Sequence, residues 1–196
     1  MGSALLSQWV DGPEAITVVD PAGNAVPDGV TLVADRADVS GERFDLVIAA
    51  VKPQLIDDVM ADYTENLAPG GYVLSIAAGY SAARLSRLMG DAAVIRTMPN
   101  LPAAIGQGVS GICPGPNATG SHPSHAESFM RRAGSTITVD SEEKLMDTVT
   151  EIQESTDVFD EAGYELVGLR IEMGFNPKVV PRIRRIKDIS DREFRR

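Results

Sequence analysis

The chain has 196 residues, of which 43% are hydrophobic and 23% charged, and its formal net charge is −10. This composition is typical of a globular protein and allows one full domain with an appendage, or two small domains. The negative charge argues against nucleic-acid binding by the main body, and no apolar run approaches the roughly 18 residues that span a membrane. No secretory signal is recognisable and Cys113 is the only cysteine, so we expect no internal disulfide and a reducing, cytoplasmic setting.

Short apolar runs alternate with helical patterns through the first 150 residues. The apolar spacing predicts a helix over residues 1–10, with Trp9 in the core, and a strand over residues 15–19 that ends at Asp20-Pro21. Further strands are predicted over residues 30–34, 44–51, 72–78, 93–96, 109–113 and 136–139, helices over residues 55–67, 81–89 and 125–132, and a turn over residues 69–71. This alternation is typical of an α/β fold with a Rossmann-like, doubly wound parallel sheet.

The apolar run over residues 46–51 does not alternate, which favours a strand buried on both faces in the middle of a parallel sheet. Three successive strands end in kinked or permissive tips: Lys52-Pro53, Ala78-Gly79 and Met98-Pro99-Asn100. Parallel strands would bring these tips to one edge, where open α/β sheets bind ligands. The first stretch alone is equally well explained as a buried strand followed by a solvated Lys52.

Asp20 follows Gly2 by 18 residues. In a dinucleotide-binding unit, an acidic residue about 20 residues after the glycine fingerprint accepts hydrogen bonds from the adenosine ribose. The alternative is that Asp20-Pro21 only opens a turn. The sequence leaves both interpretations open.

Seven short motifs follow one another over residues 2–150: Gly-Ser-Ala-Leu-Leu (2–6), Val-Val-Asp-Pro (18–21), Ala-Val-Lys-Pro-Gln (50–54), Ser-Ile-Ala-Ala-Gly (75–79), Val-Ile-Arg-Thr-Met-Pro-Asn-Leu-Pro-Ala (94–103), Gly-Gln-Gly-Val-Ser-Gly (106–111) and Glu-Lys-Leu-Met-Asp-Thr-Val-Thr (143–150). In this order and spacing they resemble the cofactor domain of the pyrroline-5-carboxylate reductase family, which catalyses the last step of proline synthesis.

The resemblance implies a Rossmann-type domain that binds NADPH or NADH and passes a hydride to the C=N carbon of 1-pyrroline-5-carboxylate, giving L-proline. It implies cofactor contacts at Gly2, Asp20, Ala50, Val51, Lys52, Pro53, Ala78 and Gly79, and a place near the nicotinamide and substrate for Met98, Pro99 and Asn100. Asp20 suits a ribose 2′-hydroxyl and repels a 2′-phosphate, which favours NADH, whereas the family often prefers NADPH. The implied partner is a small cyclic imine carboxylate; no membrane is implied, and a homo-oligomer is allowed.

Two features depart from the family. Only Met1-Gly2 remains of its opening strand and Gly-x-Gly-x-Met-Gly loop, so we expect an N-terminally truncated domain over residues 1–150 with a gap in its sheet. Residues 151–196 lack the family's helical domain, which holds the proposed proton donor, so the catalytic residue is unknown. This unrelated segment shows helical patterns over residues 152–167 and, with a basic amphipathic character, over residues 181–196.

The sequence therefore supports two hypotheses of different classes. The first is a reductase of this family, impaired or not by the missing parts. The second is a non-catalytic, truncated or chimeric Rossmann-fold protein that binds through its C-terminal segment, for which a solvated helix is the simpler interpretation. A different imine- or hydroxyacid-reducing dehydrogenase fits the Met-Pro-Asn-Leu-Pro loop less well, although Leu101 stands where the family leads us to expect Thr. His122 and His125 lack a third ligand, so we predict no metal site.

Overall fold

The computed structural model describes residues 1–148, 150, 164–172 and 178–185, and the chain divides into two compact units, Met1–Met146 and Asp147–Arg196. The strands of the first unit are β1 (Thr17–Val19), β2 (Thr31–Val33), β3 (Phe44–Ala49), β4 (Leu67–Ser75), β5 (Ala93–Pro99), β6 (Gly108–Pro114) and β7 (Gly134–Thr138). Its helices are α1 (Gly2–Trp9), α2 (Ile56–Val59), α3 (Ala82–Leu88) and α4 (His122–Met130), and residues 142–148 are also helical. Short 3₁₀ turns lie at Arg36–Val39, Pro53–Leu55, Met60–Asn66, Leu101–Ile105 and Arg131–Ala133. None of the described helices is long and apolar enough to cross a membrane.

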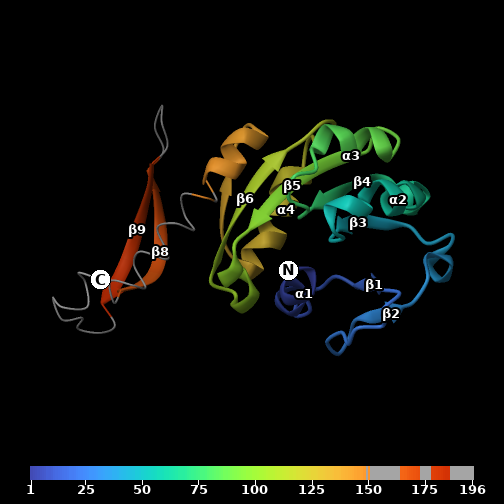
Figure 1. Ribbon diagram of the computed structural model, residues 1–196, viewed down its shortest axis with the longest axis horizontal. Helices are drawn as coiled ribbons and strands as arrows, with labels where there is room; N and C mark the ends of the chain where they lie inside the picture. Colours follow the sequence, from blue (N-terminus) through green and yellow to red (C-terminus); the bar gives the residue numbers. More distant parts are fainter. Residues whose placement is uncertain (149, 151–163, 173–177, 186–196) are drawn as a thin grey trace. The chain divides into compact units, whose positions relative to one another are not determined.

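Strands β3 to β7 form one sheet in the order β3-β4-β5-β6-β7 (Figure 1). The pairs β3–β4 and β4–β5 are parallel, as predicted, and so is β6–β7, whereas β5–β6 is antiparallel. The reason is the connection: residues 100–107 join β5 to β6, and a parallel crossover needs about a dozen residues or more. The mostly parallel α/β fold is thus confirmed, with one antiparallel pair that the sequence pattern did not reveal.

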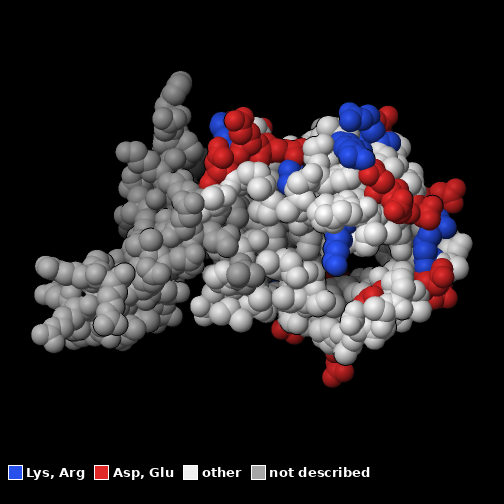
Figure 2. Space-filling model, in the orientation of Figure 1, with Lys and Arg blue, Asp and Glu red and all other residues white. Residues whose placement is uncertain are grey.

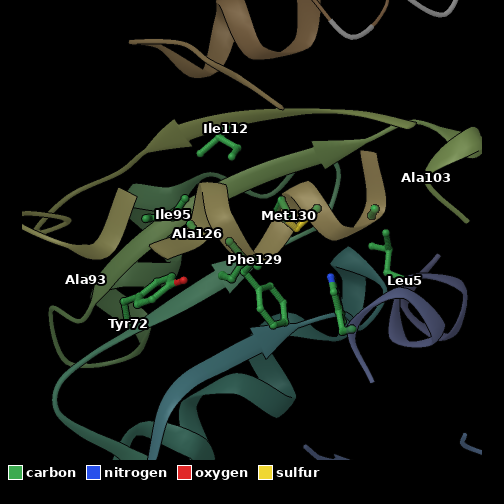
Figure 3. Packing of buried hydrophobic residues seen from close by; sticks show 12 residues of the cluster. Leu5, Tyr72, Ala93, Ile95, Ala103, Ile112, Ala126, Phe129 and Met130 are labelled. Atoms are coloured by element: carbon green, nitrogen blue, oxygen red, sulfur yellow. The ribbon is translucent and has the colours of Figure 1, made fainter. Parts of the chain in front are cut away.

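Helices cover both faces of this sheet, which makes it doubly wound. On one face, Leu74 and Ile95 pack with Leu5 and Trp9 of α1 and with α4, where Phe129 lies 4.7 Å from Trp9 between ring centroids (Figure 3). On the other face, alternate residues of the same strands pack against α2 and α3. Because successive side chains of a strand point to opposite faces, a continuous apolar run is what such a sheet needs.

The β1–β2 pair forms a separate parallel sheet that shares no backbone ladder with β3. This agrees with the expected interruption of the sheet between the strand that ends at Asp20 and the strand over residues 44–49. Figure 2 shows the surface hollowed between the regions of β3 and β1. Residues 46–48 of β3 are half-buried rather than buried, because only one side of this strand is paired.

Residues 55–67 do not form the single helix that the apolar spacing predicted. The chain passes from a 3₁₀ turn into the short α2 and then into a second 3₁₀ stretch. Ile56 and Met60 are buried, whereas Leu55 is 46% exposed. Aspartates are weak helix formers, and the segment contains Asp57, Asp58 and Asp62.

The predicted turn at residues 69–71 lies inside β4. The register there jumps from the pair Phe44↔Leu67 to the pair Leu46↔Tyr72, so residues 68–71 bulge out of the ladder. Gly70 takes φ = +78° in this bulge, a conformation that glycine adopts readily. The sequence therefore correctly indicated a change of chain direction at residues 69–71. It was predicted as a turn before the strand, whereas it is a bulge inside the strand.

In the second unit, β8 (Tyr164–Glu172) and β9 (Lys178–Arg185) form an antiparallel pair running from Tyr164↔Arg185 to Glu172↔Lys178. The helices predicted over residues 152–167 and 181–196 are wrong where they are described, since residues 164–167 and 181–185 are strand. The remaining parts of both ranges lie outside the described residues. The β-branched residues of the run Lys-Val-Val-Pro-Arg-Ile-Arg-Arg favour a strand over a helix.

An ion pair that joins the end of α1 to the end of α4 gives a stability prediction. Arg132 donates to both carboxylate oxygens of Glu14, at 2.6 and 2.7 Å, and this bond lowers the pKa of Glu14. We expect Glu14→Gln to cost about 1 kcal/mol at pH 7, since the pair is about one third exposed and partly screened. A lowered folded-state pKa stabilises above the unfolded value, so the difference between wild type and variant shrinks as pH falls below about 4.

Urea unfolding at pH 7 and pH 3, followed by the fluorescence of Trp9, measures this difference. Glu127→Gln is the matched control, because it breaks the more exposed Arg131–Glu127 pair within the same helical segment and is expected to cost under about 0.5 kcal/mol. An equal cost for the two variants would contradict the prediction.

Candidate functional site

The tips of β3, β4 and β5 lie at one edge of the sheet. Ala49 pairs with Ser75, and Ser75 pairs with Arg96, so the ends of β3 and β4 are level with the second half of β5. Beyond β3 the chain turns at Lys52, which caps the 3₁₀ turn that begins at Pro53. The predicted tips of β3, β4 and β5 are therefore adjacent, as the sequence analysis expected from a parallel arrangement of these strands.

The segment after β4 exposes its backbone at this edge. Ala78 and Gly79 are exposed, while Ala77 and Tyr80 on either side are buried. Gly79 takes φ = +74°, and a Cβ built on it would meet no atom within 4 Å. A ligand can therefore approach this backbone closely, which is the geometry expected where a glycine faces a nucleotide.

The start of α1 lies against the end of β3. A Cβ built on Gly2 would be 3.1 Å from the Cβ of Ala50, so the two residues are in contact. The free N–H groups of the first helical turn carry a partial positive charge. Gly2 and Ala50, which the resemblance assigns to one site, are thus neighbours in the structure.

Asp20 follows β1, and its carboxylate organises the next turn. Its oxygens accept hydrogen bonds from the backbone N–H of Ala22 at 3.0 Å and from the side chain of Asn24 at 2.7 Å. These bonds, that from Asn24 first, lower the pKa of Asp20, so the side chain is a carboxylate at neutral pH. Asp20 therefore organises the turn at Pro21, and its carboxylate keeps lone pairs that a ribose hydroxyl can use.

The predicted substrate-proximal residues end β5. Met98 is half-buried, whereas Pro99 and Asn100 are buried. The Oδ1 of Asn100 accepts from the N–H of Val109 at 2.9 Å, and the N–H of Asn100 donates to the carbonyl of Val109. Asn100 therefore closes the β5–β6 connection, with one lone pair of its amide oxygen engaged by Val109.

Two residues at this edge were not predicted from the sequence as a site. Arg96 of β5 is buried, and its Nη1 lies 2.5 Å from the Oε2 of Glu142, while the Oε1 of Glu142 accepts from the N–H of Ala82 at 2.8 Å. A signal for Arg96 was available, because a basic residue inside an otherwise apolar strand requires a partner. Nothing in the sequence indicated that Glu142, far along the chain, is that partner.

A second polar cluster stands beside the same loop. Tyr80 donates to Asp57 at 2.7 Å, and Arg84 lies 2.5 Å from the other oxygen of Asp57 and 4.9 Å from the centre of the Tyr80 ring. Burial, followed by this hydrogen bond, raises the pKa of the Tyr80 hydroxyl. The cluster ties α2 to α3 and fixes the residue that follows Gly79.

The histidines contribute to packing within the fold. Nδ1 of His125 lies 2.9 Å from the hydroxyl of Tyr72, and Nε2 of His122 lies 3.0 Å from the carbonyl of Gly70. No group of three metal-binding side chains occurs among the described residues. Burial raises the pKa of the Cys113 thiol, which disfavours the nucleophilic thiolate.

The chain is similar in sequence to curated pyrroline-5-carboxylate reductases. It is 32% identical over 169 residues to the reductase of Methanosarcina acetivorans, an alignment that covers 81% of this chain and 62% of the relative. The chain therefore spans about three fifths of the length of that relative. No family profile matches the chain.

Solved structures of the same enzymes have a similar fold. The reductase of Coxiella burnetii superposes with a TM-score of 0.65 at 23% identity, over 82% of this chain and 66% of that one. A pyrroline carboxylate reductase of Plasmodium falciparum with NADP bound superposes with a TM-score of 0.65 at 16% identity, over 83% and 65%. At these identities the two likenesses establish the α/β fold.

Proposed function

The chain is a relative of the pyrroline-5-carboxylate reductases over part of their length, and from this we propose that its first unit binds NAD(P)H at the edge where β3, β4 and β5 end. The observation that supports this most directly is the alignment of the strand tips beside the open backbone of Gly79. A nicotinamide cofactor supplies the hydride in such enzymes. The protein positions the cofactor against the substrate and provides the electrostatic environment of the reaction.

The residues present fit such a cofactor in two places. The open space at Gly79 admits a ligand against the backbone, and the first turn of α1, next to Ala50, offers unpaired N–H groups to a pyrophosphate. In this proposal Lys52 and Pro53 border the cofactor, and Met98 and Pro99 face the reacting carbon of the substrate.

The proposed reaction is reduction of a cyclic imine carboxylate, 1-pyrroline-5-carboxylate, to L-proline. A hydride adds to the imine carbon and a proton adds to the ring nitrogen, so the imine is reduced and the cofactor oxidised. No proton donor can be assigned from the described residues. We therefore separate nucleotide binding, which the first unit is expected to perform, from turnover, which also needs a proton donor.

Titration of the purified chain with NADH and NADPH tests the proposal, read by nucleotide fluorescence and by the shift in Tm. Micromolar affinity supports it, and a turnover assay with the cyclic imine then tests the reaction. A folded chain that binds neither cofactor at millimolar concentration excludes an enzymatic role, which leaves the alternative: a non-catalytic Rossmann-fold protein acting through its C-terminal segment.

Asp20 gives a prediction about cofactor preference. We expect NADH to bind more tightly than NADPH, because the exposed carboxylate accepts from a ribose 2′-hydroxyl and repels a 2′-phosphate. Asp20→Asn keeps an oxygen for the N–H of Ala22 and removes the charge. The ratio of the NADPH and NADH dissociation constants should therefore fall about tenfold, corresponding to about 1.4 kcal/mol.

Parallel titrations of wild type and variant with both cofactors measure this ratio. Asp28→Asn is the control. Asp28 lies in the loop before β2, so this substitution removes the same charge at a position away from the end of β1. An unchanged ratio in Asp20→Asn would show that the residue serves the turn alone.

A further inference from the structure

Arg96 is the one charged residue that is buried among residues 1–148. It lies on β5, two residues after Val94, and so on the sheet face that packs against α2 and α3. Its side chain is 5% exposed, and its Nε is buried without a hydrogen-bond partner. A cation in such a place is costly unless a counter-charge lies close by.

Glu142 supplies that counter-charge and at the same time binds the backbone of another element. One oxygen lies 2.5 Å from Nη1 of Arg96, and the other accepts from the N–H of Ala82 at 2.8 Å, where α3 begins. Arg96 also reaches the carbonyl of Ala77 through Nη2, at 3.5 Å, which is a weak contact. The pair thus contacts both ends of residues 77–82.

These contacts enclose the exposed part of the sheet edge. Between Ala77 and Ala82 the chain passes through Ala78 and Gly79, whose backbone is open to a ligand. Ser81 caps α3 through the N–H of Arg84, so Glu142 supplies a second, charged acceptor at the same helix end. Residues 77–82 are therefore held at both ends by the Arg96–Glu142 pair.

We propose that Arg96 and Glu142 are a positioning pair, which holds the backbone of residues 77–82 in the conformation that receives the nucleotide. Neither residue touches the nucleotide; they act through the segment between them. The part of this proposal that concerns nucleotide affinity rests on the proposed function, whereas the part that concerns the segment does not.

The test compares Glu142→Gln with the wild-type chain in two measurements. Amide hydrogen exchange should become about tenfold faster at residues 77–82, because the neutral amide no longer neutralises Arg96. The dissociation constant for NADH should rise about tenfold for the same reason. Glu142→Asp keeps the charge on a shorter side chain and should recover part of both effects.

Glu14→Gln is the matched control, since it removes a carboxylate from another partly buried arginine pair, between the ends of α1 and α4. It should lower the Tm without changing exchange at residues 77–82 or the affinity for NADH. Equal changes of exchange and NADH affinity in Glu14→Gln and Glu142→Gln would show that the Arg96–Glu142 pair only stabilises the fold, and would overturn the proposal.

The two measurements also separate the possible failures. Unchanged exchange at residues 77–82 in Glu142→Gln overturns the positioning role outright. Faster exchange with unchanged NADH affinity overturns its link to the nucleotide. If the wild-type chain binds no nucleotide, the proposed function fails, and the exchange result alone decides whether the pair holds the segment.

Discussion

Replacement of Gly134 by alanine is expected to destabilise the first unit by about 3–5 kcal/mol, combining backbone strain with an unrelieved overlap. Gly134 begins β7 at φ = +132°, a conformation that L-residues rarely adopt. A Cβ there would lie 2.1 Å from the carbonyl oxygen of Gly108, its partner across the β6–β7 ladder. The overlapping atoms belong to the backbone, so no side-chain rotation relieves the contact.

Gly108 cannot move away from the added methyl group, because it is packed on its other side. A Cβ on Gly108 would lie 2.4 Å from backbone atoms of Ala103 in the 3₁₀ turn that follows β5. Three segments therefore meet at distances that only glycine permits. Because Asn100 closes the same connection, we expect this junction to fix the end of β5 as well.

Urea unfolding followed by tryptophan fluorescence measures the predicted loss, since Trp9 is the only tryptophan and reports on the first unit alone. The control is Ser135→Ala at the next, exposed residue of β7, which should cost under about 0.5 kcal/mol. A loss under about 1 kcal/mol in Gly134→Ala, with an unchanged m-value, would show that the ladder relaxes and would refute the close contact.

The central part of the fold was predictable because one physical requirement acts on consecutive residues. In β4 and β5, alternate residues pack against the helices on opposite faces of the sheet. Every position is therefore apolar in the runs that contain Val73 and Val94. Such runs predict both the strands and their burial on two faces. The cap at Ser81 was likewise local, because a serine oxygen binds an N–H three residues later.

The parts that sequence reasoning missed depend on distant residues or on exact lengths. The antiparallel pairing of β5 with β6 is decided by the short connection at residues 100–107. The pairing of Arg96 with Glu142 spans 46 positions, and neither residue indicates the other. Likewise, nothing in the sequence indicates that the side-chain oxygen of Asn100 accepts from the N–H of Val109 on the next strand.

The sequence therefore predicted where in the fold the candidate site lies, but fewer of the side-chain contacts that hold it. The tips of β3, β4 and β5 lie together because parallel strands put their carboxyl ends on one edge. The groups that hold these tips rigid come from elsewhere: Glu142 from the segment after β7, and Asp57 from α2. The family resemblance and the strand patterns predict the strand tips. They give no indication of Glu142 or Asp57.

Replacement of Gly79 by valine is expected to weaken binding of NADH about 100-fold while costing the fold only about 2 kcal/mol. Valine is poorly suited to φ = +74°, which accounts for the loss of stability. The open space beside Gly79 contains no protein atom within 4 Å of an added Cβ. The side chain is therefore accommodated by the protein and, in the proposed function, occupies the space through which the nucleotide approaches the backbone.

Gly70→Val is a matched control for this substitution. Gly70 takes φ = +78°, is exposed and also has no atom within 4 Å of an added Cβ, but it lies in the bulge before the buried part of β4. Gly70 precedes and Gly79 follows the same buried stretch. Comparing the two variants therefore distinguishes an effect of backbone strain from an effect of position at the site. We expect equal losses of Tm in the two variants, and a loss of NADH affinity in Gly79→Val alone.

Fluorescence titration with NADH and a thermal melt of each variant provide both quantities from the same samples. If Gly79→Val binds NADH as tightly as Gly70→Val does, the nucleotide does not approach the end of β4, and the site proposed at this edge is wrong. If both variants lose affinity in proportion to their loss of Tm, binding follows global stability. Only a loss confined to Gly79→Val supports a nucleotide held against the backbone between β4 and α3.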